Sequence, residues 1–396
     1  MTENEKYLEA ARGLRPLIAA AGEQGDKERR LPREVAEGMA DAGLFRMLLA
    51  QSIGGGGADL VSFLRVAEEV ASADGSAGWC LVQGALSATQ VAPFLPLEVA
   101  REVFSEERSI LANGTGPGGR AVVEGNGYRL TGEWPFASGC MHATWLKGAA
   151  PVYSADGTPV RALNGGQASG GGTDGAPEVR TFLFPASEAT LRDVWHVSGL
   201  RGTGSNTICV SELFVPAERS VCLAQATLRE PDTLAALPYA SVAAAGFCAV
   251  ALGVARGALD AFIELAATKT ARGMKGALRE DPVTQDGVAR AEAQLRAARA
   301  FLFEATAEAW EAASQGQGLA ARQRAVLRLA ATSGIHQAAQ VVDTAYHAAG
   351  ATAIFESQPF ERRFRDVHAI TQQTQARRQH FGVVGRVLLG VNDNGT

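Results

Sequence analysis

The segment 362–380 carries side chains that could move a proton without a carboxylate. It reads RRFRDVHAITQQTQARRQH and contains a single acidic residue. A histidine and four polar residues recur at offsets of three, four, seven and eleven, which would place them on one face of a helix. They are His368, Thr371, Gln372, Gln375 and Gln379. Such a face could hold a phenol, an amine or an indole by hydrogen bonds, because imidazole can accept a proton near neutral pH. A solvated or subunit-facing helix surface is the simpler alternative.

A second set of candidates lies in LTGEWPFASGCMHATW, residues 130–145. Trp134, Phe136 and Ser138 alternate along this stretch, so an extended strand would place all three on one face. Two aromatic rings and a hydroxyl together offer an apolar wall and a hydrogen-bond donor for a planar ligand. An ordinary β core with a satisfied serine would show the same spacing.

Two glycine-rich stretches differ in what they can do. RGTGSN, residues 201–206, concentrates backbone amides and small hydroxyls, which suits close approach of the backbone to a ring edge or a phosphate, although a tight hairpin turn has the same composition. GTGPGG, residues 114–119, formally matches GxGxxG, but a stretch with strand character follows it, where a dinucleotide-binding fingerprint needs a helix. We therefore interpret GTGPGG as a turn.

The elements that must position these residues fall into three regions. Apolar residues follow helical spacing to about residue 107, short β-rich runs fill about 110–221, and the chain is alanine-rich and helical from about 238. We expect an α+β, mainly α fold with domains at 1–108, 109–225 and 226–396. The expected helices of an up-and-down bundle in the last domain are 241–271, 285–314, 319–349 and 366–390. GGQASGGGTDG, 165–175, is expected to be a mobile surface loop without a chemical role.

Composition excludes several classes of protein. With 37 basic and 42 acidic residues the net charge is −5, so no cationic surface favours nucleic acid as a partner. The five cysteines are scattered and never form a CxxC pair, and the histidines lack HxxxH spacing, so neither a disulfide framework nor a metal site is expected. We see no signal peptide and no apolar run of the roughly 18 residues that span a bilayer, and we expect a cytoplasmic protein without membrane contact.

The order helices, β region and bundle, together with LTGEWPFASGCMHATW and WHVSGLRGTGSNTICVSELFVPAERSV (195–221), resembles the acyl-CoA dehydrogenase superfamily. The chain is most similar to its branch of two-component flavin-dependent monooxygenases. The resemblance covers nearly the whole chain. It implies an N-terminal helical domain, a middle β-barrel or sandwich domain, a C-terminal four-helix bundle, and a homotetramer assembled through the bundles.

The resemblance also implies where a flavin is held. Ser138 would lie near the flavin N5 atom, Trp134 and Phe136 would wall the ring, and Thr203 and Ser205 would help to hold it. A flavin ring needs such an apolar wall and one or two donors.

Further positions follow from the same resemblance. In ATKTARG, either Lys269 or Arg272 would reach the cofactor of a neighbouring subunit, but the Arg-Lys-x-Phe-Gly pattern of the superfamily is not intact, so FAD and FMN both stay open. In DGSAGWCLVQG, Trp79 and Gln83 would wall the substrate cavity, with core packing and a surface amide as the alternatives.

Both positions that supply the catalytic carboxylate of an acyl-CoA dehydrogenase lack an acid here. The first falls near Gln373 and Thr374, with no Asp or Glu from 367 to 390, and the second lies within 235–259, which also contains none. Related monooxygenases carry a histidine in an RDxH setting, which matches His368. We therefore expect His368 to assist substrate deprotonation or oxygen transfer, with Gln372 contacting the substrate.

The expected function is the oxygenase component of a two-component monooxygenase. It would take reduced FMN or FAD from a separate flavin reductase and use dioxygen to hydroxylate or N-oxidise a small organic substrate, such as an aromatic compound or a natural product. One alternative is an acyl-CoA dehydrogenase or oxidase with a displaced base. Another is a noncatalytic scaffold that kept the fold.

Overall fold

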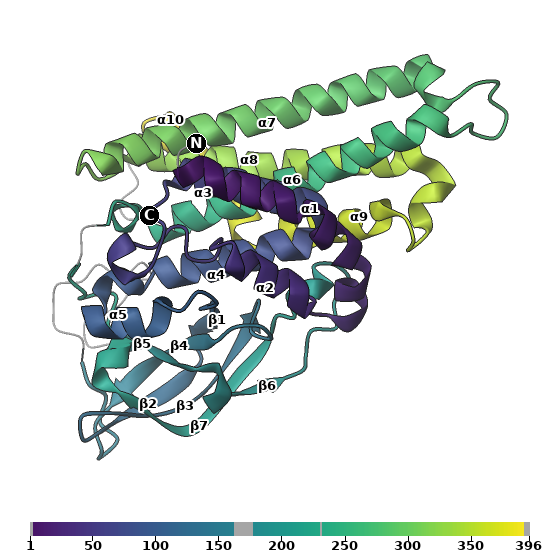
Figure 1. Ribbon diagram of the computed structural model, residues 1–396. Coiled ribbons are helices and arrows are strands. Elements are labelled where there is room, and N and C mark those ends of the chain that lie inside the picture. The colour runs from purple at the N-terminus through teal and green to yellow at the C-terminus, as the bar shows by residue number, and fades with distance from the viewer. Residues whose placement is uncertain (1–2, 162–176, 230–231, 392–396) are drawn as a thin grey trace.

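Helices form one layer of the molecule and a β sheet forms the other (Figure 1). The computed structural model describes residues 3–161, 177–229 and 232–391, so the glycine-rich stretch 165–175 lies outside the described residues. The N-terminal helices are α1 (Glu3–Glu28), α2 (Arg33–Asp41), α3 (Leu60–Ala73), α4 (Gly75–Thr89) and α5 (Leu97–Phe104). Asp59 and Asp74 cap α3 and α4, because each carboxylate accepts a backbone N–H of the first turn.

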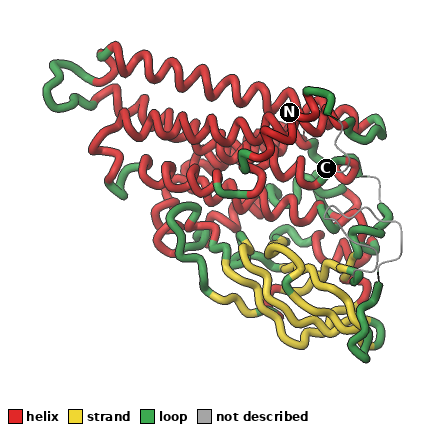
Figure 2. The backbone as a smooth tube through the Cα atoms, turned by 180° about the vertical axis from the view of Figure 1, so that it is seen from behind, coloured by secondary structure: helices red, strands yellow, loops and turns green. Residues whose placement is uncertain are grey.

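The middle of the chain forms an eight-stranded sheet (Figure 2). Its strands are β1 (Leu111–Pro117), β2 (Gly119–Glu124), β3 (Gly127–Ala137), β4 (Trp145–Tyr153), β5 (Val179–Pro185), β6 (Thr190–Arg192), β7 (Asn206–Pro216) and β8 (Ser220–Val221). The strand order is β6-β7-β3-β2-β4-β5-β8, and β1 pairs in parallel with β4. A strand, β2, follows GTGPGG, so this stretch has no helix after it to bind a dinucleotide.

The C-terminal region contains α6 (Tyr239–Thr268), α7 (Pro282–Ser314), α8 (Ala321–Ala349), α9 (Pro359–Thr371) and α10 (Gln379–Leu388). The first three match the expected bundle helices, but the expected fourth helix is wrong. It is broken into α9 and α10, with a short 3-10 turn, η9 (Thr374–Ala376), between them. The side chain of Gln373 accepts the backbone N–H of Gln375 at 2.5 Å, and this local bond competes with helix continuation.

Helix α6 lies at the centre of the helical layer. It packs against α3 and α8, and residues of the N-terminal and C-terminal helices share one apolar core. By length and composition α6 is apolar enough to cross a membrane, contrary to the expectation that no such run exists, but nearly all of that stretch is buried inside the fold. The mainly α fold with N-terminal helices, a central sheet and a C-terminal helical region is confirmed.

Candidate active site

Three hydroxyls from two distant parts of the sequence meet where β3, β7 and α4 come together. Ser138 Oγ lies 2.7 Å from Ser205 Oγ, which lies 2.8 Å from Thr203 Oγ1. The indole N–H of Trp79 donates to Ser138 Oγ at 3.1 Å. All four side chains are buried. This hydroxyl cluster (Ser138, Thr203 and Ser205) brings together three residues that the sequence proposed for the flavin, and Trp79, proposed for the substrate cavity, contacts it.

The backbone on both sides of the hydroxyl cluster is strained. Phe136 and Leu200 adopt left-handed φ values of 59° and 54°, which cost a non-glycine residue about 1–2 kcal/mol each. The Phe136 ring is 60% exposed and contacts Trp195 edge-on at a centroid distance of 6.0 Å. Strain of this kind is typical of functional sites, and here it turns an aromatic ring outward beside buried hydroxyls.

The expectation that Trp134, Phe136 and Ser138 share one face is wrong. The pairing of β3 with β7 shifts register between Trp134 and Ala137, so the simple alternation ends at this point. Trp134 is fully buried in the core of the sheet, where its indole N–H donates to the carbonyl of Ala149 at 2.8 Å. Its ring therefore has no surface to offer a ligand, and Phe136 is the aromatic residue that can wall one.

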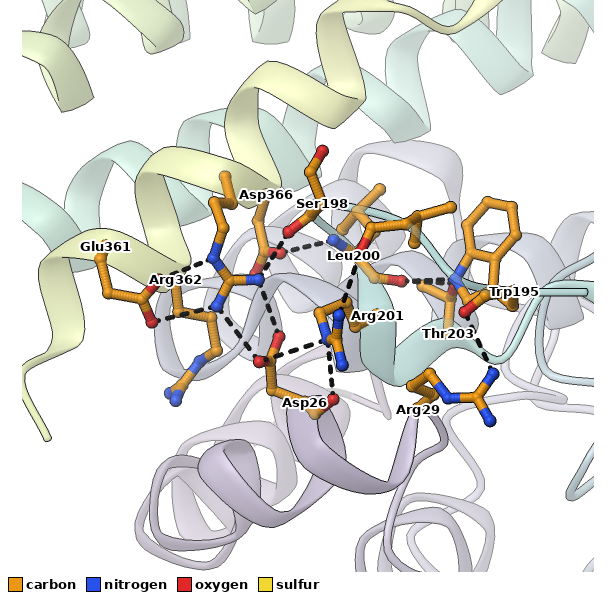
Figure 3. Close-up of polar contacts among 12 residues, drawn as sticks. Asp26, Arg29, Trp195, Ser198, Leu200, Arg201, Thr203, Glu361, Arg362 and Asp366 are labelled. Atoms are coloured by element: carbon orange, nitrogen blue, oxygen red, sulfur yellow. Dashed lines mark hydrogen bonds and ion pairs between the residues drawn. The ribbon is translucent and has the colours of Figure 1, made fainter. Parts of the chain in front are cut away.

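Helix α9 and helix α1 hold the loop that carries Thr203 and Ser205 (Figure 3). The Asp366 carboxylate accepts the backbone N–H of Leu200 at 2.6 Å, and Arg365 donates to the carbonyl of Ser198 at 2.6 Å. Asp26 of α1 pairs with Arg365 at 3.1 Å. These contacts from α9 and α1 explain how Leu200 is kept in its strained conformation.

Asp366 is almost fully buried, and its charge is disfavoured there. Burial raises the pKa of the Asp366 carboxyl, and the negative charge of Asp74 raises it further. The N–H of Leu200 and the guanidinium groups of Arg362 and Arg365 act in the opposite direction. The loop is therefore tied to a carboxyl group whose protonation changes nearer neutral pH than usual.

The residues around the hydroxyl cluster fit a flavin ring. His142 lies beside the cluster, 3.1 Å from where a Cβ on Gly139 would stand, and burial lowers the pKa of His142 to about 4, so that the ring is neutral. Its Nε2 atom is buried and has no hydrogen-bond partner within the described ranges. A planar ligand with polar edges would fit these groups: the unpartnered Nε2 of His142, the outward ring of Phe136 and the hydroxyl of Ser138.

His368 lies in a cavity away from the hydroxyl cluster. Its Nε2 atom is 2.8 Å from Oδ1 of Asp343 on α8, and the pair opens into a cavity of about 770 Å³. Thr371, Gln372 and Gln379 also line this cavity, whereas Gln375 instead contacts Arg328, so the expected single polar face is only partly formed. The sequence missed Asp343 because it lies one helix away from His368.

The remaining expected cofactor residues lie apart from both places. The Lys269 amine donates to the carbonyl of Ala349 at 2.5 Å and to Thr352 at 2.7 Å, so it holds the end of α8. Arg272 is exposed in the turn that follows α6. Arg272 is therefore the better placed of the two to reach another molecule.

One face of α4 continues from the hydroxyl cluster to a second cavity. The sequence spacing of Trp79, Gln83, Ser87 and Gln90 places them along that face. Ser87 hydrogen-bonds Asn113 of β1, and Gln90 accepts from the amine of Lys147 on β4 at 2.6 Å. Gln90, Asn113 and Lys147 line a cavity of about 570 Å³.

One feature of the sequence marks Lys147. It is a charged residue in the middle of the otherwise uncharged strand WLKGAAPVY. Burial lowers the pKa of its amine to about 7. Within residues 3–161, 177–229 and 232–391, no group of three or more His, Cys, Asp or Glu side chains gathers as a metal site would require.

Known proteins resemble this chain over most of its length. The N-terminal domain of acyl-CoA dehydrogenases matches residues 5–96, and the C-terminal domain of acyl-CoA dehydrogenases matches residues 245–378. Indole-3-acetate monooxygenase of Pseudomonas putida is 30% identical over 88% of this chain and 84% of its own. The flavin-dependent monooxygenase oxygenase subunit HsaA of Mycobacterium tuberculosis is 29% identical over 92% of this chain and 90% of its own.

A solved structure shows the same fold. XiaF from a Streptomyces species, in complex with FADH2 and glycerol, superimposes with a TM-score of 0.85 at 24% identity, and the match covers 99% of this chain and 97% of that chain. The expected family, cofactor class and type of reaction are confirmed. The chain therefore belongs to the acyl-CoA dehydrogenase superfamily, and it is the oxygenase component of a two-component monooxygenase that uses reduced flavin from a separate reductase.

Proposed function

We propose that this oxygenase hydroxylates or N-oxidises a small aromatic substrate beside the hydroxyl cluster. The observation that carries the proposal is the buried chain of hydrogen bonds from Trp79 through Ser138 and Ser205 to Thr203. When bound there, reduced flavin supplies the two electrons that let one atom of dioxygen enter the substrate while the other leaves as water. The P. putida relative is named for an aromatic acid, which supports this substrate class.

Each residue near the hydroxyl cluster has a separate part in this proposal. Ser138 donates a hydrogen bond to the flavin ring near N5, and Ser205 and Thr203 hold the Ser138 hydroxyl in position. Phe136 walls the ring from its exposed position, and the buried surroundings keep water away from the reacting atoms. Trp79 stacks on Phe247 at a centroid distance of 4.4 Å, so it forms a rigid wall for substrate. Gln83, one turn further along α4, offers the substrate an amide.

His368 is the proposed proton acceptor. Asp343 fixes its ring through Nε2, and among the described residues no hydrogen bond engages Nδ1, so Nδ1 would take a proton from a phenol or an amine. Gln372 lines the same cavity and would orient the substrate. Helix α9 connects this cavity to the hydroxyl cluster, because Asp366 holds Leu200 while His368, two residues later, meets α8.

The proposal extends to assembly and cellular location. We place the protein in the cytoplasm as a homotetramer that receives FADH2 or reduced FMN by diffusion from its reductase, with Arg272 reaching the cofactor of a neighbouring copy. Large apolar side chains on and after α10 support assembly through the helices, since they are exposed in the single chain. They are Phe381, Val383, Leu388, Leu389 and Val391.

Ser138→Ala and His368→Ala test the two halves of the proposal. Ser138→Ala removes a hydrogen bond to the flavin, so anaerobic fluorescence titration should show reduced FMN or FAD binding about tenfold more weakly. His368→Ala should keep normal flavin affinity. With indole, phenol and indole-3-acetate as probes, it should form product roughly 100-fold more slowly and release dioxygen as hydrogen peroxide instead.

The exposed residues Ser52 and His347 provide matched controls. Ser52→Ala and His347→Ala should behave as the wild type in both assays. Unchanged flavin affinity in Ser138→Ala would contradict the placement of the flavin, and unchanged coupling in His368→Ala would contradict the role of the histidine.

A further inference from the structure

Lys147 is a buried lysine without a carboxylate partner. Its side chain is 3% exposed, and its amine donates to the backbone carbonyl of Ser87 at 2.8 Å and to the side-chain oxygen of Gln90 at 2.6 Å. No acidic side chain forms an ion pair with it in the described part of the chain, and burial alone shifts its pKa. Lysine is almost never fully buried unless it is paired. A buried ammonium without an anionic partner destabilises the folded state. Binding a ligand would explain why the lysine is there.

Lys147 lines a cavity with room for a small molecule. The cavity of about 570 Å³ lies between α4, β1, β4, β5 and the start of α6, and this volume is in the range of small-molecule sites. Its walls are apolar at Pro117, Ala149, Val179 and Leu223. Its polar groups come from Gln90, Asn113, Thr115, Lys147, Thr181 and Tyr239. An ammonium group has three N–H donors, and the contacts with Ser87 and Gln90 use two of them, so one is left for a ligand.

Helix α4 connects this cavity to the proposed flavin site. Trp79 contacts Ser138 of the hydroxyl cluster, and Gln90 contacts Lys147, eleven residues later on the same helix face. At the rise of an α helix the two contacts are about 16 Å apart along α4. Between the two contacts along α4, Ser87 hydrogen-bonds Asn113. The cavity and the hydroxyl cluster therefore lie along one face of α4.

We infer that Lys147 determines substrate specificity, by binding an anionic oxygen of the substrate, a carboxylate or a phenolate, in this cavity. The inference rests on the proposed function, because it assigns an anionic group of that reaction's substrate to Lys147, on the same face of α4 as the hydroxyl cluster. An anion gives the buried ammonium the partner that the chain does not supply. A neutral substrate of the same shape leaves the ammonium unpaired, so the site discriminates against it.

The electrostatics of the cavity agree with this assignment. Burial lowers the pKa of Lys147 to about 7, so an anion that binds beside the amine raises this pKa and keeps the amine protonated. The other titratable group on the cavity wall is Tyr239, whose pKa burial raises to about 12, so it stays neutral. The side chains that face Lys147 from α4 and β1 are uncharged. Affinity for an anion should therefore fall as pH rises above about 7, as the free amine loses its proton.

Binding measurements on the purified full chain test the inference without turnover. Phenylacetate and its neutral analogue phenylacetamide are titrated calorimetrically, and 4-nitrophenolate is followed by its absorbance with 4-nitroanisole as its neutral partner. The wild type should prefer each anion over its neutral partner. Lys147→Met, which has a similar length and no charge, should lose affinity for the anions by about tenfold or more and change affinity for the neutral partners by less than about twofold. Lys147→Arg should retain part of the preference for the anions.

The controls separate this inference from the proposed function. Lys275→Met, which removes an exposed lysine, should bind like the wild type. Thermal unfolding and anaerobic flavin titration of Lys147→Met should show a folded protein with wild-type flavin affinity. Equal affinity of the wild type for an anion and its neutral partner would overturn the inference, and so would a Lys147→Met variant that loses reduced flavin and keeps the anion preference. Either result leaves the Ser138→Ala test of the flavin site intact.

Discussion

Phe136 has a conformation that a glycine would adopt more easily, so replacing it separates stability from function. Its φ is left-handed and its ring is largely exposed, so the ring contributes little burial to offset the strain. Phe136→Gly should raise the free energy of unfolding by about 0.5–1 kcal/mol, measured by urea denaturation, and weaken the binding of reduced flavin. Phe214 is also exposed but lacks a left-handed φ, so Phe214→Gly should destabilise the fold. A lower free energy of unfolding in Phe136→Gly would contradict the claim that the left-handed φ of Phe136 destabilises the fold.

Site residues could be predicted from the sequence where they belong to a short motif. Ser138, Thr203 and Ser205 come from two short motifs, and the structure brings their hydroxyls together. The predicted position of Trp134 is wrong because strict alternation requires regular strand pairing. The pairing of β3 with β7 shifts register beside Trp134, and the sequence of β3 alone does not show this shift. The setting of Lys147 depends on Ser87 and Gln90, about 60 residues earlier, so spacing within the strand could not reveal it.

At the level of elements, Asp366 of α9 should make the stability of the fold depend on pH. The pKa of this buried carboxyl is raised, so at intermediate pH the native state holds a proton that the unfolded chain has released. The free energy of unfolding should therefore fall as pH rises from the usual carboxyl range toward the raised pKa. Asp366→Asn keeps an oxygen for the Leu200 N–H and removes the titration. Its stability should decline less between about pH 5 and about pH 7.5, by on the order of 1 kcal/mol.

Chemical denaturation at the two pH values measures this difference. Asp286→Asn serves as the control, since Asp286 is exposed and pairs with Arg290 on the surface. The control should keep the pH dependence of the wild type. If Asp366→Asn kept it as well, the titration would have to be assigned to another group.

The existence of the helices was predictable, and the break between α9 and α10 was not. The alanine-rich, apolar composition predicted α6, α7 and α8, because long runs of small apolar residues favour buried helices. The segment after Thr371 is polar, so no such run constrains it. Its path is decided by contacts from α8, where Thr332 donates to the carbonyl of Gln375 at 3.0 Å and His336 contacts the carbonyl of Ala376 at 2.9 Å.

At the scale of the whole molecule, the exposed apolar side chains of α10 predict association. Val383 and Leu388 are 36% and 48% exposed in the single chain. A charge at either position should oppose burial against another copy, so Val383→Asp combined with Leu388→Asp should lower the mass measured by light scattering during size-exclusion chromatography. Val123→Asp, at an exposed apolar position on the sheet, is the matched control and should leave the mass unchanged. A monomeric wild type would contradict the proposed homotetramer.

The central position of α6 has a consequence for how the chain is made. Its glycines Gly246, Gly253 and Gly257 lie so close to α3, α4 and Arg363 that a single added carbon would collide with them. These tight contacts join parts of the chain that leave the ribosome far apart in time, so the earliest helices cannot finish burying their apolar faces alone. Until α6 emerges, the nascent protein exposes apolar surface that favours aggregation. Its yield in a cell should therefore depend on how well chaperones shield that surface during translation.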